Sequence, residues 1–162
     1  MIWQTRSNDS ADTVSIGEQL GRALKPPMVI ELSADLGGGK TTFVSGLARG
    51  LGIEQTVTSP SFTLSREYRA KSGTKLYHFD FYRLNDSGVL ADQLAEAISD
   101  PKAIVCVEWS DIVKGILPSQ RLTIKFAQVA SNADARDIQF EYPESLRPTI
   151  EARENSKEEL KP

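Results

Sequence analysis

The sequence contains a single cysteine, Cys106, which lies inside an apolar run, so no disulfide can form within the chain. No apolar run approaches the length of a membrane-spanning helix. The first ten residues, MIWQTRSNDS, are polar and lack the apolar segment of a secretory signal. From these absences we expect a cytoplasmic protein that does not enter a membrane.

A surplus of basic residues is also missing. The net charge is −3 and the pI is about 5.3. A protein that binds nucleic acid mainly through phosphate contacts usually carries a positive charge. Any role on RNA is therefore expected to run through a partner protein. The remaining composition, with 40% hydrophobic and 25% charged residues, is that of an ordinary soluble globular domain.

A glycine-rich stretch lies between a short apolar run and a helical pattern. The run Met28–Leu32 is typical of a buried strand, and Lys40–Leu51 has the apolar spacing of a helix. Between them the letters ADLGGGKT have the spacing of a P-loop, with Ala34 in place of the first glycine. The motif requires a strand before it and a helix after it, and this sequence predicts both.

The residue types of this stretch suit the binding of phosphates. Glycines allow the backbone to curl so that several N–H groups converge on one point, and the N-terminus of the next helix adds more. Lys40 is predicted to contact the β- and γ-phosphates, and the Thr41 hydroxyl is predicted to bind Mg²⁺. The alternative is a glycine-rich turn with an incidental lysine. The predicted contacts to ATP or ADP are Asp35, Leu36, Gly37, Gly38, Gly39, Lys40, Thr41 and Thr42.

Two carboxylates stand out in the predicted strands, Asp80 inside one and Glu108 at the carboxyl end of another. Asp80 lies between two phenylalanines in the run KLYHFDFYRL, where a carboxylate is costly unless it is paired or bound to a cation. It is interpreted either as part of a salt bridge, to Arg66 or Arg83, or as a ligand of Mg²⁺ or water. Glu108 ends the apolar run AIVCVE, where a Walker-B carboxylate belongs; the alternative is a glutamate that caps the next turn. His78 is interpreted as structural.

Apolar periodicity predicts the remaining elements and favours an α/β fold. The predicted helices are Ser10–Lys25, Val89–Ile98 and a short Asp111–Gly115. The predicted strands are Met1–Arg6, Phe62–Arg69, Lys75–Leu84, Ala103–Trp109, Arg121–Val129 and Asp137–Tyr142. The last two alternate as an antiparallel pair at a sheet edge would, with Asn132–Ala135 joining them.

Two further segments are expected to be irregular. Thr56–Ser61 is rich in hydroxyls around a proline, so it is predicted to be a loop, either an ordinary turn or a sensor of the γ-phosphate. From Pro143 the sequence turns to charge and proline. Residues 1–142 are therefore predicted to form one P-loop ATPase domain, and residues 143–162 a charged tail that is helical or disordered.

Four motifs in this order resemble the TsaE family, also called YjeE, of bacterial P-loop ATPases in tRNA modification. They are SADLGGGKTTFVSGLARGLG, VTSPSFTL, LYHFDFYRL and VEWSD, and they cover most of Leu32–Asp111. The helix that carries Thr13 and Gly17 bears a fainter likeness to the family. Three positions depart from the family pattern: Ala34 replaces a usual glycine, Gly38 a common alanine and Ser61 a common threonine.

The resemblance implies a central mixed sheet flanked by helices. It also implies an ATPase that supports threonylcarbamoyl transfer to a tRNA adenosine through two partners, TsaB and TsaD, so that tRNA is reached indirectly. Carried over by motif, the P-loop roles fall on Lys40 and Thr41 and the Mg²⁺-associated acids on Asp80 and Glu108. The family's tryptophan after the second acid is Trp109, and its switch-like loop falls on Thr58–Thr63. Arg136 is proposed as a C-terminal nucleotide contact.

Two other functions fit the same motif. A small-molecule P-loop kinase could grip its acceptor with Arg66, Arg69 and Arg83. A non-catalytic module could bind a nucleotide only to change its affinity for a partner. The sequence shows no Asn-Lys-x-Asp guanine motif, which favours adenine. On the primary hypothesis, hydrolysis is slow in isolation and faster with partners, because no lid or arginine finger is evident.

Overall fold

A computed structural model describes residues 1–35, 37–82, 84 and 88–155. The predicted contact Leu36, the arginine Arg83 and residues 156–162 of the predicted tail lie outside the described residues. The strands are β1 Ile2–Ser7, β2 Met28–Ser33, β3 Ser65–Arg69, β4 Lys75–Asp80, β5 Ala103–Glu108, β6 Leu122–Val129 and β7 Asn132–Glu141. The helices are α1 Ser10–Ala23, α2 Lys40–Gly50, α3 Gly88–Ser99 and α4 Arg147–Asn155, with 3-10 turns η1 Ser110–Val113 and η2 Glu144–Leu146.

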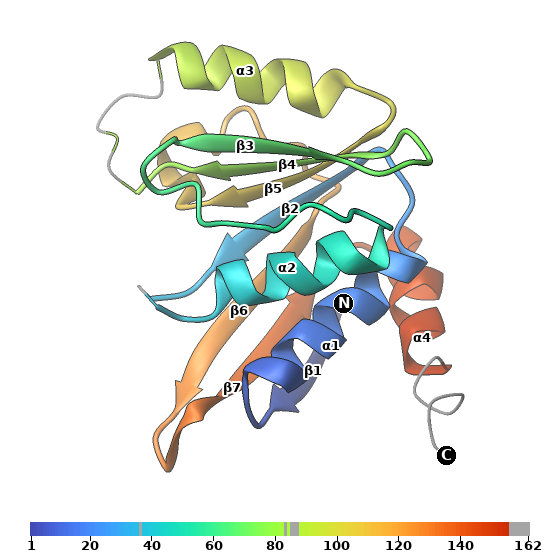
Figure 1. Cartoon of the computed structure of the whole chain (residues 1–162), viewed down its shortest axis with the longest axis vertical. Coiled ribbons are helices and arrows are strands. Elements are labelled where there is room, and N and C mark those ends of the chain that lie inside the picture. The colour runs from blue at the N-terminus through green and yellow to red at the C-terminus, as the bar shows by residue number, and fades with distance from the viewer. Residues whose placement is uncertain (36, 83, 85–87, 156–162) are drawn as a thin grey trace.

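The strands form one mixed sheet in the order β1-β7-β6-β2-β5-β4-β3. The four central strands are parallel to one another in the order β6-β2-β5-β4. The outer pairs β6 with β7, β7 with β1 and β4 with β3 are antiparallel. Helices α1 and α2 lie on one side of the sheet, and α3 lies on the other side of β3, β4 and β5 (Figure 1). The predicted α/β fold with a central mixed sheet flanked by helices is confirmed.

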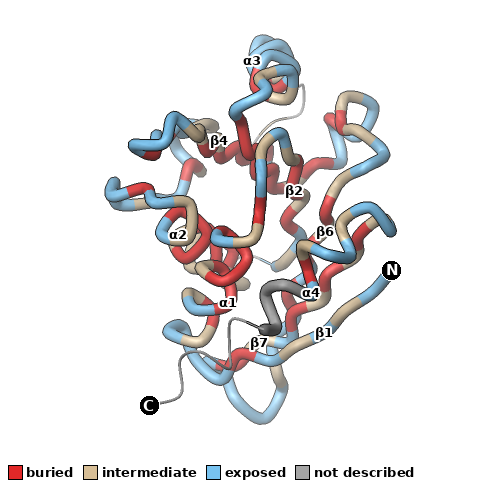
Figure 2. The backbone as a smooth tube through the Cα atoms, turned by 90° about the vertical axis from the view of Figure 1, so that its right-hand side faces the viewer, coloured by how far each residue is buried: buried red, intermediate tan, exposed pale blue. Residues whose placement is uncertain are grey.

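The helix pair α1 and α2 packs backbone to backbone. A Cβ atom on Gly17 of α1 would lie 2.3 Å from the carbonyl oxygen of Phe43, and one on Gly46 of α2 would lie 2.0 Å from that of Val14. Glycines therefore let the two helices approach closely, which fixes α2 and the loop before it. Buried residues gather in α1, α2 and the central strands, while β1 stays largely exposed (Figure 2).

Two hydrophobic clusters cover the two faces of the sheet. One contains Leu20, Phe43 and Leu47 from α1 and α2 and lies against alternate residues of β2, β5 and β6. The other joins Leu90 and Leu94 of α3 to the opposite faces of the central strands. Both clusters meet at β2, β5 and β4, so these strands are covered on both sides.

The predicted strand ends were wrong around the loop before β3 and the segment after β4. The run Phe62–Arg69 becomes a strand only at Ser65, because Leu64 adopts a left-handed conformation, with φ of 65°, that breaks the extended chain. The run Lys75–Leu84 stops at Asp80, whose own carboxylate accepts the N–H of Tyr82 at 2.9 Å and turns the chain. Both corrections shorten the strands beside the predicted site.

The predicted edge position of the last two strands was also wrong. Strand β6 pairs with β2 and β7, and β7 pairs with β6 and β1, so neither is an edge; the edges are β1 and β3. Residues Asn132–Ala135, expected to be a connection, belong to β7, and the turn occupies Ala130 and Ser131. The antiparallel pairing of β6 with β7 is confirmed.

The segment after β7 returns to the core. Helix α4 lies beside α1, and its Ile150 side chain is buried in the same cluster as Leu20 (Figure 1). The described part of the predicted tail is thus helical and packed. Within the described residues, no helix has both the length and the apolar character needed to cross a bilayer.

Candidate functional site

The glycine-rich loop joins β2 to α2 and needs glycine at two positions. Gly37 and Gly39 have φ values of 76° and 98°, which residues with a Cβ rarely adopt. The N–H of Gly38 donates to the carbonyl oxygen of Asp35 at 2.9 Å and closes the bend. Ala34 is not among the described residues with positive φ, so alanine in place of the first glycine imposes no backbone strain there.

The N-terminus of α2 is open to an anion. Its N-cap is Gly39, which offers no side-chain hydrogen bond to the first turn, and no acidic residue lies in that turn. The first N–H groups of the helix and the positive end of its dipole therefore face the loop. Thr41 and Thr42 of the same turn are half-buried and bring hydroxyl groups to this end of the helix.

Lys40 is folded back onto the loop. Its side chain is 7% exposed, and its Nζ donates to the carbonyl oxygens of Ala34 at 3.2 Å and Asp35 at 3.3 Å. The same Nζ lies 3.6 Å from Oε2 of Glu108 and 5.3 Å from the centre of the Trp109 ring. The ammonium group thus lies between loop carbonyls, a carboxylate and an aromatic face, each of which favours a positive charge.

Asp80 and Glu108 lie side by side at the carboxyl ends of two parallel strands. They are partners in the register of β4 and β5, and Glu108 is also the partner of Leu32 in β2, which leads into the loop. Both acids are buried, at 3% and 5% exposure. The sequence placed Glu108 at a strand end and Asp80 inside a strand. The structure places both acids at strand ends, with Glu108 beside Lys40.

The carboxylate of Asp80 is held by the loop before β3. Its Oδ2 accepts the Ser61 hydroxyl at 2.6 Å, and its Oδ1 accepts the N–H of Tyr82. Among the described residues, no arginine or lysine pairs with Asp80, so the proposed salt bridge to Arg66 is absent. The hydroxyl-rich loop predicted at Thr56–Ser61 therefore contacts the site directly.

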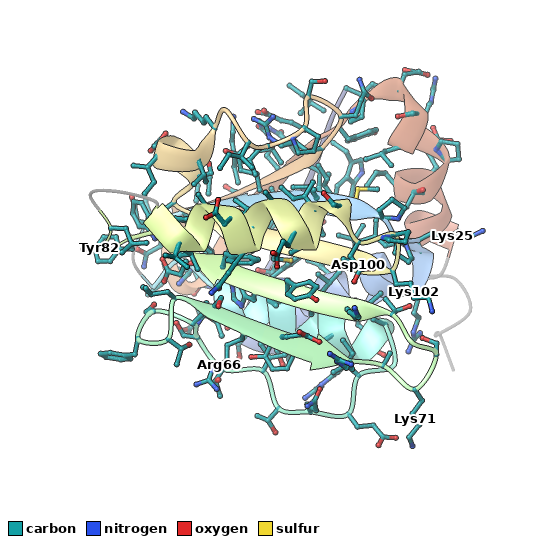
Figure 3. The ribbon with its side chains drawn as sticks, turned by 90° about the horizontal axis from the view of Figure 1, so that it is seen from above. Lys25, Arg66, Lys71, Tyr82, Asp100 and Lys102 are labelled. Carbon is teal, nitrogen blue, oxygen red and sulfur yellow. The ribbon has the colours of Figure 1, made fainter. Side chains whose placement is uncertain are left out.

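The loop is anchored on both sides of this contact. The Tyr68 hydroxyl accepts the N–H of Thr58 at 3.1 Å and lies 3.2 Å from its carbonyl oxygen. At the other end, the left-handed Leu64 accepts the N–H of Asp80 at 2.9 Å. Beyond Asp80, the ring of Tyr82 contacts Trp109 in a tilted arrangement with centroids 4.9 Å apart, and Tyr82 projects from the end of the sheet (Figure 3).

Glu108 has a second contact, to a histidine that the sequence did not single out for function. Its Oε1 lies 2.7 Å from Nε2 of His78, and His78 is fully buried. Cys106, the register partner of His78, is also buried, and burial raises the pKa of its thiol. Cys106 therefore stays a neutral thiol and is not a nucleophile.

A pocket of about 370 Å³ opens beside the loop. It is lined by Asp9, Ser10, Thr13, Gly37, Gly39, Thr42, Asp134 and Arg136. Arg136, predicted as a nucleotide contact, reaches the loop: its Nε donates to the carbonyl oxygen of Gly38 at 3.2 Å. Asp9 and Asp134 were not predicted, because only the packing of α1 and β7 against α2 brings these distant segments together.

The predicted site residues thus lie at the carboxyl ends of the central strands and in the loop and first turn of α2 that follow β2, except for Leu36, which lies outside the described residues. In the described part of the chain, no three histidine, cysteine or acidic side chains form a group that could hold a metal ion by themselves. A Mg²⁺ ion commonly keeps several waters and takes one or two carboxylates plus phosphate oxygens. Thr41, Asp80 and Glu108 fit that partial donor set.

Comparisons with known proteins agree on one family. The model of the family "Threonylcarbamoyl adenosine biosynthesis protein TsaE" matches residues 7–138. The TsaE proteins of Bacillus subtilis and Treponema pallidum are 36% and 37% identical over 138 and 124 residues, covering 85% and 76% of this chain and 83% and 90% of theirs. The crystal structure of Bacillus subtilis YdiB matches with a TM-score of 0.79 and 31% identity over 97% of both chains. The chain belongs to the TsaE family of tRNA threonylcarbamoyladenosine biosynthesis proteins.

Proposed function

We propose that the protein binds ATP with Mg²⁺ and hydrolyses it in support of threonylcarbamoyl transfer to tRNA. The proposal is based on the groups that lie at the carboxyl ends of the central strands. There, a helix N-terminus without a capping side chain, a buried lysine and two buried carboxylates meet. Buried charges are expensive to keep without a purpose, and this set supplies what phosphoryl transfer needs.

The proposed nucleotide lies across the loop. Its phosphates accept the N–H groups between Gly37 and Thr42, and Lys40 turns from the loop carbonyls to the β- and γ-phosphates. The ribose and base enter the pocket of about 370 Å³ beside Thr13 and Arg136. A volume of this size is typical of small-molecule sites.

Three side chains would hold the proposed metal. Thr41 supplies a hydroxyl from α2, and Asp80 and Glu108 supply carboxylates from β4 and β5. When bound, Mg²⁺ neutralises charge on the β- and γ-phosphate oxygens. Asp80 would exchange its hydrogen bond from Ser61 for a metal-bound water, which links the loop before β3 to the presence of nucleotide.

In the hydrolytic step, a water oxygen forms a bond to the γ-phosphorus and the bond to the β–γ bridging oxygen breaks. Glu108 or Asp80 orients that water and takes its proton, while Lys40 and the loop N–H groups stabilise charge on the transferred phosphoryl group. Each of these groups is already held by packing or hydrogen bonds. Positioning and electrostatics therefore account for the chemistry.

Replacement of Lys40 by alanine tests the proposal. We expect Lys40→Ala to lower ATP turnover on the order of 100- to 1,000-fold, as loss of a transition-state cation or donor does. The control is Lys102→Ala, which removes the same charge at the far end of the sheet from Tyr82 (Figure 3). Phosphate release and calorimetric titration with ATP or ADP at millimolar Mg²⁺ are the measurements. A folded wild-type protein that takes up neither nucleotide would contradict the proposal.

We further propose that TsaB and TsaD partners complete the site. Large apolar side chains are exposed around it: Phe62 at 85%, Val89 at 74%, Tyr82 at 48% and Ile112 at 40%. Apolar side chains gathered beside a polar site mark interaction surfaces. Turnover is therefore expected to rise when both partners are added, and equal rates with and without them would count against the proposal.

Hydrolysis fits the described arginines better than the kinase alternative does. Arg69 is paired with Glu67 at 2.5 Å, and Arg66 is exposed on the edge strand β3, whose other side meets no strand (Figure 3). Neither arginine is presented to the loop that would hold the γ-phosphate. Labelled γ-phosphate should appear as inorganic phosphate; transfer to a metabolite would favour a kinase. A module that only binds nucleotide would keep its function in Glu108→Ala.

A further inference from the structure

We infer that His78 is a positioning residue for Glu108, an inference that rests on the proposed function. The ring and the carboxylate form a hydrogen bond of 2.7 Å between Nε2 and Oε1. His78 is fully buried and Glu108 is 5% exposed, so water does not compete for this bond. The histidine cannot itself touch a nucleotide, because the carboxylate lies between it and the loop.

The tautomer of the ring follows from its partners. A carboxylate can only accept, so Nε2 of His78 must carry the proton that is shared with Glu108. The other ring nitrogen, Nδ1, is buried and has no hydrogen-bond partner among the described residues. A proton on Nδ1 would leave a buried donor unpaired, so the hydrogen-bond pattern assigns the proton to Nε2.

The unpartnered nitrogen argues against a purely structural role. A buried polar atom without a partner lowers stability. An apolar side chain at position 78, beside the core cluster that contains Leu76, would avoid this cost. The one hydrogen bond that the ring makes is directed at the acid that the proposed mechanism uses. The chain thus accepts an unpaired acceptor at this position in order to hold one carboxylate.

The need for a second contact appears when Lys40 leaves. Within the described residues, the side chain of Glu108 has two polar partners, Lys40 at 3.6 Å and His78. On the proposed function, the ammonium turns to the phosphates when the nucleotide binds. His78 then remains the fixed contact of Glu108, and it keeps Oε2 directed toward the loop while Oε1 stays occupied.

The ring position is set by the backbone rather than by its own contacts. His78 lies opposite Cys106 in the register of β4 and β5, one step inward from the pair Asp80 and Glu108. Both strands are continuous through this point, and β5 is buried at all six positions. The imidazole is therefore presented to Glu108 by a rigid part of the sheet.

A spectroscopic test reads the hydrogen bond without any nucleotide. The chain has one histidine, so its ring nitrogen signals need no assignment. We expect a pyrrole-type shift for Nε2, a pyridine-type shift for Nδ1 and a slowly exchanging Nε2 proton that is lost in Glu108→Ala. The opposite tautomer, or a spectrum that does not change in Glu108→Ala, would overturn the inference whatever the nucleotide experiments give.

A kinetic test measures whether His78 positions Glu108 for catalysis. His78→Leu removes the donor and is expected to lower kcat by about 10- to 100-fold with KM changed by less than about three-fold. His78→Gln restores an N–H donor and is expected to recover most of kcat. The matched control is Cys106→Ala, equally buried on the neighbouring strand, which should change stability but not kcat.

The outcomes separate the possible roles of the histidine. A purely structural histidine would lower the melting temperature in His78→Leu without changing kcat of the folded fraction, and that result would overturn the inference. If His78→Leu fails to fold, the kcat of His78→Gln and the histidine ring spectrum of the wild type test the inference instead. Added to Glu108→Gln, His78→Leu should lower kcat no further, since the contact it removes no longer serves a carboxylate. Absence of ATP binding by the wild-type protein would instead defeat the proposed function.

Discussion

The two halves of the sheet use their faces differently. Strand β5 is buried at all six positions, and its neighbours β2 and β4 are covered by α2 on one side and by the α3 cluster on the other. Strands β7 and β1 alternate, with one face on the core and the other exposed. A polar side chain is costly to bury in the half that contains β2, β5 and β4. In the half that contains β7 and β1, a polar side chain on the exposed face stays in water and carries no such cost.

Polar residues behave accordingly in the two halves. In the covered half Glu108 contacts both Lys40 and His78, and Asp80 lies beside it as its register partner. On the open face charges pair across strands in water, as in Arg6 with Asp137 at 2.7 Å. A hollow of about 700 Å³, larger than the pocket beside the loop, is lined in part by the paired Arg6 and Asp137. Buried polar groups, and not the size of a hollow, mark the site.

The sharpest way to test this contrast is to disturb the layer that covers the site. Gly46→Ala places a Cβ 2.0 Å from the carbonyl oxygen of Val14, where only backbone can move. We expect a loss of about 1–3 kcal/mol from overpacking, which outweighs the helix propensity gained. Each kcal/mol lowers the melting temperature by about 2–4 °C in a chain of this size.

The matched control for this substitution is Gly115→Ala. No atom lies within 4 Å of a Cβ built on Gly115, so its melting temperature should stay near that of the wild type. Thermal unfolding of both variants, followed by circular dichroism, gives the comparison. If Gly46→Ala were as stable as Gly115→Ala, the close contact of α1 and α2 would not limit the position of the loop.

Local patterns in the sequence predicted the covered half well. The glycines, Lys40 and the two acids are short-range features, so the loop, α2 and β5 followed from residue types alone. The strand β4 was expected to continue to Leu84 but ends at Asp80. The contact between His78 and Glu108 could not be predicted, because thirty residues separate them and only the strand register brings them together.

The open half was predicted less well for a physical reason. The alternation in Arg121–Val129 was interpreted as the mark of an edge strand, but β6 lies inside the sheet between β2 and β7. Alternating polarity reports that one face of a strand meets water, and it does not report how many neighbours the strand has. Periodicity therefore gave the exposure of β6 and not its position.

A smaller effect is expected in the loop itself, where two departures from the family pattern compensate each other. A Cβ on Gly38 would lie 2.5 Å from the Cβ of Ala34 and 2.8 Å from the carbonyl oxygen of Asp35. The family's usual arrangement, glycine at 34 and alanine at 38, carries one methyl group in this space, as this chain does. Gly38→Ala alone is expected to weaken ADP binding, and Ala34→Gly added to it should restore part of the loss.

The measurement is a double-mutant cycle on the dissociation constant for ADP. Residues in contact typically couple by about 0.5–3 kcal/mol, and we expect the low end here, since the contact to Asp35 persists in the double variant. Ala34→Gly alone should change little, because Ala34 has no strained backbone to relieve. Additive effects in the cycle would show that the two positions are independent.

The smallest effects are expected from two paired acids that differ in burial. The side chain of Glu31, in the covered half, is 12% exposed and accepts Arg121 at 2.7 Å, Thr123 at 3.2 Å and the Ser110 hydroxyl. Burial raises the pKa of Glu31, but these hydrogen bonds together outweigh it and leave the pKa below its ordinary 4.5. A lowered pKa stabilises the fold above pH 4.5, and this stability is lost as pH falls through the folded value.

The stability advantage of wild type over Glu31→Gln should therefore be full at pH 7 and shrink below pH 4.5, as urea unfolding at several pH values can measure. Asp137 provides the contrast. Its hydrogen bond from Arg6 also lowers its pKa, yet its side chain is 52% exposed. Water and salt screen such a pair, so Asp137→Asn should track the wild type at every pH. A larger pH-dependent loss in Asp137→Asn than in Glu31→Gln would mean that the open face contributes more stability than its exposure implies.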